Sequence, residues 1–294
     1  MYDDIAASKK ILHKKPFLTP IQIEQYHRDG FLVLDDFVNI DICELLRQRA
    51  IKIINDIDLN EIKSVFSTKQ KEHERDLYWL NSGDKIRYFF EEGALDEAGE
   101  LTCDKLTAIN KIGHALHDLD PLFSCFSRSH KLAQTAHDLG IIDPLLIQSM
   151  YICKQPYIGG EVTCHQDSTY LFAQEQYVTG FWFAIEDATI DNGCLWAIPG
   201  GHHTPLKSRM IRKGDQVEII TYDKTPWKID KTVPLEVSRG SLVVLHGLLP
   251  HFSRENLSPN SRHAYTLHVM PSNSQFSADN WLHRAPDMPF RGFF

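Results

Sequence analysis

The sequence predicts a mainly β domain, a sandwich or barrel, with α-helices on its N-terminal side. Two observations support this fold class. Segments with helical spacing and helix caps lie in the first half of the chain, whereas the second half contains short segments rich in aromatic and β-branched residues. Gly, Pro, Asn and Asp separate those short segments, as in antiparallel β proteins. We expect residues 1–18, which are polar and basic, to form a flexible tail and residues 19–294 to form a single domain.

The composition excludes several classes of protein. Hydrophobic residues make up 43% and charged residues 24%, as in an ordinary globular protein. A formal net charge of −8 argues against nucleic acid as the partner, because binding phosphates requires clustered Lys and Arg. The 6 cysteines are scattered without a CxxC pair, which fits reduced thiols. Without a signal peptide or an apolar run long enough to span a bilayer, we expect a cytoplasmic monomer with a small-molecule partner.

The first expected helix begins after Thr19, where Gln22 can complete a capping box, and ends at Gly30. The strand "FLVLDDF" follows it. A second, amphipathic helix opens at Asn39. Its apolar residues recur at spacings near three and four and are expected to pack into the core: Ile42, Leu45, Leu46, Ile53 and Ile57.

A third helix is expected from Pro121 to Leu139, with Asp120 as its cap and Gly140 as its stop. The region from 58 to 104 has no clear pattern.

The strands of the second half are expected in five segments, and the charged stretch 203–236 is expected to be a long insertion between two of them. The five segments are "LLIQSMYICKQ", "VTGFWFAIED", "GCLWAIPG", "GSLVVLHG" and "RHAYTLHVM".

The segment "CHQDSTY" contains a candidate metal site. His165 and Asp167 are two residues apart, so on a strand their side chains point to the same face. Two histidines and one carboxylate leave three positions open on Fe(II), although this spacing also fits the solvated face of an ordinary strand. A second histidine must come from farther along the chain, where the candidates are His202, His203, His246, His251, His263, His268 and His283.

The segment "HFSRENLSPNSR" narrows this choice. It begins with His251 and ends with Arg262, at the start of an expected strand. A guanidinium can bind a carboxylate through two parallel hydrogen bonds, so Arg262 could anchor a dicarboxylate beside the metal. By spacing alone His246 remains an alternative ligand, at the end of a strand near the site.

Several segments, taken together and in this order, are similar to the phytanoyl-CoA dioxygenase family of Fe(II)- and 2-oxoglutarate-dependent oxygenases. The resemblance covers about residues 19–290. The segments that carry it are "NSGDKIRYFFEEGA", "INKIGHALHDLDPLF", "QSMYICKQPYIGGEVTCHQD", "DNGCLWAIPGGHH", "HFSRENLSPNSR" and "DNWLHRAP".

The resemblance implies a double-stranded β-helix core, the jelly-roll or cupin-like fold, supported by the N-terminal helices. It implies that iron is bound by His165, Asp167 and His251. It also places 2-oxoglutarate at the metal ligands His165 and Asp167 and against Lys111, Met150, Trp182 and Arg262, with Ser253 helping to hold the far carboxylate. From the residues alone, Lys111 would be a surface lysine near the start of a helix, and Met150 and Trp182 would be core residues.

The function implied by the resemblance is hydroxylation of an organic substrate with O2 and 2-oxoglutarate, releasing succinate and CO2. A carboxylate at Asp167, where related halogenases have a small residue, favours hydroxylation. The alternative is a non-catalytic jelly-roll protein that binds metal and 2-oxoglutarate as a sensor or interaction module. A zinc hydrolase is disfavoured because no glutamate base lies near the three ligands.

Two further groups have alternative interpretations. An acyl-CoA or other lipid-like molecule is one candidate substrate, and the basic stretch Lys207–Lys213 could bind CoA phosphates or be a solvated loop. His114 and His117 could bind a metal from one helix face, but a structural pair is the favoured interpretation.

Overall fold

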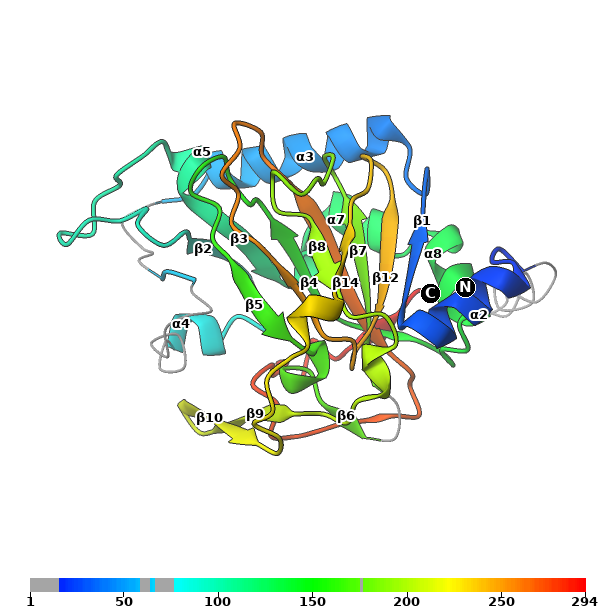
Figure 1. The fold of residues 1–294 in the computed structure, drawn as a ribbon. Coiled ribbons are helices and arrows are strands. Elements are labelled where there is room, and N and C mark those ends of the chain that lie inside the picture. Colours follow the sequence, from blue (N-terminus) through cyan, green and yellow to red (C-terminus); the bar gives the residue numbers. More distant parts are fainter. Residues whose placement is uncertain (1–15, 59–63, 67–76, 175–176) are drawn as a thin grey trace.

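The computed structural model describes residues 16–58, 64–66, 77–174 and 177–294, and residues 1–15 of the expected tail lie outside this part (Figure 1). Two antiparallel sheets form the centre of the protein, with helices packed on the larger one. This confirms the expected mainly β fold with a double-stranded β-helix core.

The larger sheet contains strands from both halves of the chain. Its order is β1 (Phe31–Leu34), β12 (Leu242–His246), β7 (Thr179–Ala184), β14 (Ala264–Met270), β4 (Leu145–Ile152), β3 (Ile109–His114) and β2 (Ile86–Phe90), with β16 (Arg291–Gly292) paired to β4.

The smaller sheet faces the larger one and carries part of the candidate metal site. Its order is β11 (Val233–Leu235), β8 (Leu195–Ala197), β13 (His251–Ser253) and β5 (Val162–His165). Two further pairs are the hairpin of β9 (Ser208–Lys213) with β10 (Gln216–Thr221), and β6 (Ala173–Gln174) with β15 (Gln275–Phe276). The five expected strands are thus confirmed as β4, β7, β8, β12 and β14.

The helices come mainly from the first half of the chain, as expected. They are α2 (Pro20–Asp29), α3 (Ile40–Asn55), α4 (Leu77–Leu80), α5 (Lys105–Ala108), α6 (Leu116–Leu119), α7 (Pro121–Ser127) and α8 (His130–Asp138), with 3-10 turns η3 (Asp167–Thr169), η4 (Gly201–His203) and η5 (Ile229–Lys231). The capping box of Thr19 with Gln22 is present, and Gly30 ends α2 with a φ of 79°.

Helix α3 begins after Asn39 as expected, but the prediction of its buried face was partly wrong. Ile42 and Leu45 are 38% and 52% exposed. The buried stripe runs instead through Cys43, Leu46, Ala50 and Ile54, because the small Cys43 and Ala50 allow the helix to lie close to the sheet.

The expected helix from Pro121 to Leu139 is in fact two helices, α7 and α8. Asp120 caps α7 by accepting hydrogen bonds from two backbone amides, as expected. The chain leaves helical geometry at Arg128, whose guanidinium binds Asp118, and Ser129 is extended. The apolar spacing continues across this break because both helices pack on the same core, which explains why the sequence did not reveal it.

Strands β2 and β3 were not expected from the sequence. Every residue of β3 is buried, so its sequence does not alternate between polar and apolar residues. Lys111 therefore lies on a strand, not near the start of a helix. The stretch 203–236 is likewise more ordered than expected, because it contains the hairpin of β9 and β10, which Figure 1 shows at the opposite end of the molecule from α3.

The two faces of the larger sheet have different partners. One face packs on α3, α7 and α8 through residues such as Leu46, Phe123 and Phe183. On the other face, Trp182 and Val243 belong to a second core with Leu195 and Ala197 of the smaller sheet. The candidate site lies between the two sheets, next to this second core. Among the described residues, no helix has the length and apolar character needed to cross a membrane.

Candidate metal and dicarboxylate site

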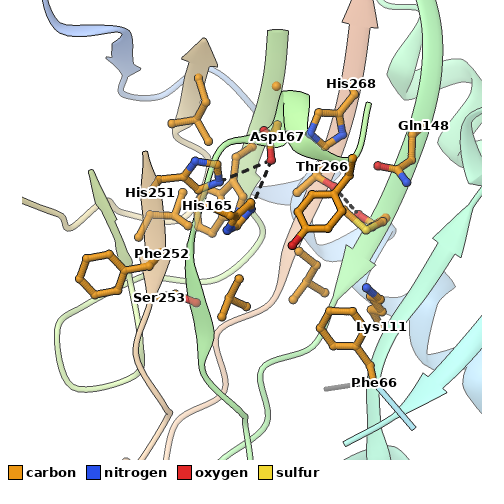
Figure 2. Close-up of a pocket in the computed structure, with 18 of the residues that line it drawn as sticks. Phe66, Lys111, Gln148, His165, Asp167, His251, Phe252, Ser253, Thr266 and His268 are labelled. Atoms are coloured by element: carbon orange, nitrogen blue, oxygen red, sulfur yellow. Dashed lines mark hydrogen bonds and ion pairs between the residues drawn. The ribbon is translucent and has the colours of Figure 1, made fainter. Parts of the chain in front are cut away.

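Strand pairing brings the candidate metal ligands together. His165 is the last residue of β5, and it lies directly opposite His251, the first residue of β13. Asp167 follows two residues later and opens the turn η3, so its side chain points back toward both histidines (Figure 2). Residues far apart in sequence therefore meet because two short strands share one register.

The three side chains form a compact cluster. Their possible ligand atoms all lie within 4.8 Å of one another. Asp167 Oδ1 lies 3.4 Å from His165 Nε2 and 3.6 Å from His251 Nε2. Among the described residues, one group of three or more His, Cys, Asp or Glu side chains lies close enough together to hold a metal ion. It consists of these three residues.

Hydrogen bonds to the backbone fix which nitrogen of each histidine faces the cluster. His165 Nδ1 lies 2.8 Å from the carbonyl oxygen of Thr163, and His251 Nδ1 lies 2.9 Å from that of Leu249. A carbonyl oxygen can only accept, so each Nδ1 donates a proton. In the neutral rings each Nε2 lone pair is then available to a metal.

Burial also favours the protonation states that a metal requires. Burial lowers the pKa of His251 to about 4, against the opposing effect of Asp167, so this ring is neutral at physiological pH. Burial alone would raise the pKa of Asp167, but the nearby His251 and His268 hold that pKa well below its ordinary value. The cluster thus offers a carboxylate and a neutral imidazole.

His246 was the alternative ligand, and the structure places it elsewhere. It ends β12 as expected, but its ring packs against His202, with centroids 5.0 Å apart, and is not part of the metal cluster. His251 is the histidine that meets His165.

A cavity of about 420 Å³ opens beside the cluster. Figure 2 shows Lys111 across this cavity from His165 and His251. The residues that the resemblance assigned to 2-oxoglutarate all line the cavity: Lys111, Met150, His165, Asp167, Trp182, Ser253 and Arg262.

Arg262 is a buried cation without an anionic partner among the described residues. It is 2% exposed, and its Nε and Nη1 have no hydrogen-bond partner within the described ranges. Burial lowers its pKa to about 10, so it stays charged at neutral pH. Because a buried charge without a partner is unfavourable, this guanidinium indicates a site for an anion.

The polar residues between His251 and Arg262 shape the loop that carries Arg262. Asn256 is fully buried, and its Nδ2 donates to the carbonyl oxygens of Lys154 and Asn260 at 3.1 and 2.8 Å. The backbone N–H of Arg262 donates to the same oxygen of Lys154 at 3.1 Å. The segment is therefore a structural support for the arginine.

Lys111 is a second buried cation. It is 6% exposed, and its Nζ lies 3.2 Å from the centroid of the Phe66 ring. Burial lowers its pKa to about 7, although Glu91 acts in the opposite direction. The protonation of Lys111 is therefore sensitive to any charged ligand that enters the cavity.

Among the cavity residues that had no role assigned from the sequence are His268 and Gln148. His268 Nε2 lies 3.1 Å from Asp167 Oδ2, and Gln148 lies opposite His268 on the neighbouring strand β4. His268 was only one of seven downstream histidines, and only strand register distinguishes it from the others.

The other polar groups noted in the sequence have structural partners. His114 and His117 lie on β3 and α6, not on one helix, and their Nδ1 atoms bond to Ser82 and Ser149 at 2.7 and 2.8 Å. The structural interpretation of this pair therefore accounts for both residues.

Comparisons with known proteins identify the family of this chain. The model of the phytanoyl-CoA dioxygenase family matches residues 26–264. A phytanoyl-CoA dioxygenase of Arabidopsis thaliana is 46% identical over 271 residues, covering 91% of this chain and 94% of the relative. Phytanoyl-CoA dioxygenase domain-containing protein 1 of Bos taurus is 43% identical over 283 residues, covering 93% and 97%.

Solved structures share the fold at low sequence identity. EctD from S. alaskensis in its apo form superimposes with a TM-score of 0.64 and 17% identity, over 95% of this chain and 86% of that chain. The non-heme alpha ketoglutarate dependent carbocyclase SnoK superimposes with a TM-score of 0.61 and 13% identity, over 94% and 97%. Given the family match over most of its length, the chain belongs to the phytanoyl-CoA dioxygenase family.

Proposed function

We propose that this chain is a dioxygenase that uses Fe(II) and 2-oxoglutarate to hydroxylate a small organic substrate, with release of succinate and CO2. One observation carries the proposal: a single cavity contains the cluster of two histidines and a carboxylate, and also the guanidinium of Arg262, which has no anionic partner among the described residues. Family membership supports it, as do related folds solved with bound Fe and with 2-oxoglutarate.

The donor set fits Fe(II). His165 and His251 would bind through Nε2, and Asp167 through Oδ1, since these atoms face one another. Two imidazoles and one carboxylate leave coordination positions for a chelating cosubstrate and for O2. The hydrogen bonds from Nδ1 to backbone carbonyls would keep both rings in the orientation for binding.

The cationic end of the cavity fits the dianion 2-oxoglutarate. Arg262 would bind the carboxylate far from the metal, with Ser253 as a neighbour, and Lys111 would add a second positive charge. Met150 and Trp182 would form the walls. When bound, Fe(II) and 2-oxoglutarate would together activate O2. One oxygen atom of O2 would enter succinate, and the other would enter the substrate.

The remainder of the cavity favours a compact substrate with apolar surface. Trp79 and Trp281, whose rings stack with centroids 4.0 Å apart, line it together with Leu171. Gln148 adds a carboxamide that can bind a polar group of the substrate (Figure 2). These walls would orient a C–H bond and exclude water from the reaction.

Three of the four basic residues in the stretch Lys207–Lys213, considered above as a site for CoA phosphates, contact acidic side chains of the protein. Arg209 contacts Asp279, Lys207 Nζ lies 3.1 Å from Asp223, and Lys213 contacts Glu218. The charges of these three residues are thus largely compensated, which supports a small molecule over an acyl-CoA bound through this stretch.

The test is the oxidation of 2-oxoglutarate by Fe(II)-loaded protein in air, measured as succinate, for the wild type and for Asp167→Ala. We expect turnover by the wild type, stimulated by the true substrate, and none by Asp167→Ala, which lacks the anionic ligand. His246→Ala is the control, because this histidine lies outside the cluster, and it should retain activity. Full activity of Asp167→Ala would refute the proposal.

The rival function, a sensor without catalysis, gives a different result. Such a protein would bind Fe(II) and 2-oxoglutarate in calorimetric titrations but would form no succinate, either alone or with any member of a substrate library.

A further inference from the structure

The two oxygens of the Asp167 carboxylate have different surroundings. Oδ1 faces the Nε2 atoms of His165 and His251, at 3.4 and 3.6 Å. Oδ2 points away from them and lies 3.1 Å from Nε2 of His268 (Figure 2). Because an ionised carboxylate only accepts hydrogen bonds, His268 Nε2 is the donor.

We propose that His268 is a positioning residue, which holds one oxygen of Asp167 so that the carboxylate presents only the other to the metal. This inference rests on the proposed metal site, and it adds a residue that binds neither metal nor 2-oxoglutarate in that proposal.

A glycine on the neighbouring strand β7 leaves room for the contact between His268 and Asp167. His268 lies in β14, and its partner on β7 is Gly180. A Cβ atom at Gly180 would lie 3.3 Å from Asp167 Oδ2 and 3.5 Å from His268 Nε2. The first distance is shorter than an ordinary contact, so the missing side chain of Gly180 provides the space in which the carboxylate and the imidazole meet.

Within the part of the chain that the structure describes, the ring of His268 makes one polar contact, with Asp167. The residue is 5% exposed, and its Nδ1 is buried without a partner in the described part of the chain. A buried polar atom without a partner costs about 1–3 kcal/mol, so an apolar residue would suit a purely structural role better. The contact with Asp167 therefore accounts for a histidine at this position.

The chemistry explains what the contact achieves. A carboxylate can bind a metal ion through one oxygen or through both. With two histidines and a chelating 2-oxoglutarate, a carboxylate bound through both oxygens would occupy the sixth position of an octahedral ion, which O2 needs. A hydrogen bond to Oδ2 favours binding through Oδ1 alone and keeps that position available.

The test compares His268→Leu, which has no donor, with His268→Gln, whose side-chain amide can donate to Oδ2. His246→Leu is the matched control, since it removes a largely buried imidazole outside the cavity. The probe is Co(II), which reports coordination geometry by its visible spectrum and does not require turnover. Crystal structures of the Mn(II)-loaded variants show directly how many Asp167 oxygens bind.

We expect His268→Leu to change the Co(II) spectrum, to bind Asp167 through both oxygens in the Mn(II) structure, and to weaken Co(II) binding about 10- to 100-fold, the usual effect of losing a residue that supports a ligand. His268→Gln should restore most of the wild-type spectrum, and His246→Leu should leave it unchanged. An unchanged spectrum and a singly bound carboxylate in His268→Leu would overturn the proposal.

The outcome is separable from that of the proposed function. If the wild type binds Co(II) but forms no succinate with Fe(II), the catalytic proposal fails, yet the spectra of the variants still decide the role of His268. If the wild type binds no divalent metal, both proposals are wrong.

Discussion

The guanidinium carbon of Arg262 lies 5.3 Å from the centroid of the Trp182 ring, and no carboxylate among the described residues pairs with it. The aromatic face offers some compensation for burial of the charge, but less than an anion would. The cavity thus contains a positive charge that is unfavourable until a ligand binds. This arrangement suggests that Arg262 is retained for ligand binding at some cost in stability.

Arg262→Met should therefore weaken 2-oxoglutarate binding while leaving the protein folded. A hydrogen bond to a charged group contributes about 1.5–3 kcal/mol, which corresponds to a loss of about 10- to 150-fold in affinity. The melting temperature without ligand should stay the same or rise, because an unpaired buried charge is removed. Calorimetric titration of 2-oxoglutarate and thermal unfolding measure the two effects.

The control for this variant is Arg284→Met. Arg284 is also buried, but it is paired with Asp118 at 2.9 Å. Its loss should lower the melting temperature and leave the dissociation constant of 2-oxoglutarate unchanged. The opposite pattern in the two variants would contradict the assignment of Arg262 to the ligand.

Lys111 should make 2-oxoglutarate binding dependent on pH. Burial lowers its pKa to about 7, so above pH 7 most of the unliganded protein has a neutral lysine. A bound dianion favours the charged form and raises this pKa, so binding above pH 7 takes up a proton. The dissociation constant should then increase as the pH rises, by up to about tenfold per pH unit.

Calorimetry in two buffers with different enthalpies of ionisation measures this proton uptake directly. Lys111→Met should bind 2-oxoglutarate more weakly below pH 7 and should show little of the dependence above it. Proton uptake that is the same in the variant and in the wild type would place the titrating group elsewhere.

The sequence was most informative where structure is decided locally. The cap at Thr19 and the positive φ of Gly30 follow from a few adjacent residues, and the structure shows both. His165 and Asp167 could be paired for a similar reason, since they are two residues apart. Their roles as iron ligands, like those of the 2-oxoglutarate residues, stay predictions until a ligand is bound.

The other residues of the candidate site are brought together by strand register, which no local sequence pattern reveals. His251 meets His165 across two strands that are separated by most of the second half of the chain. Lys111 lies on β3, a fully buried strand whose polar residues face a cavity. The sequence of β3 therefore lacks both the alternation of a half-exposed strand and the uniformly apolar character of a core strand. Only the family resemblance indicated that Lys111 belongs to the site. Nothing in the sequence distinguished His268 from the other histidines.

Asp118 should be important for stability but not for the chemistry. Its side chain is 1% exposed and binds Arg128, Arg284 and Arg291 at 2.6, 2.9 and 2.7 Å. Asp118→Ala would leave these cations without their shared anion, and breaking a buried pair in this way destabilises a protein by about 3–5 kcal/mol. Urea unfolding should show this decrease, whereas Co(II) binding by the folded variant at low temperature should match the wild type.

The same carboxylate should contribute to acid sensitivity. Burial acts to raise the pKa of Asp118, but His117 and the arginines around it hold that pKa well below its ordinary value. A lowered pKa means that the stabilisation is complete above the pKa of the unfolded chain, about 4, and is lost as the pH falls below that value. The free energy of unfolding of the wild type should therefore decrease below pH 4 more steeply than that of Asp118→Asn. Equal slopes would show that other carboxylates account for the acid sensitivity.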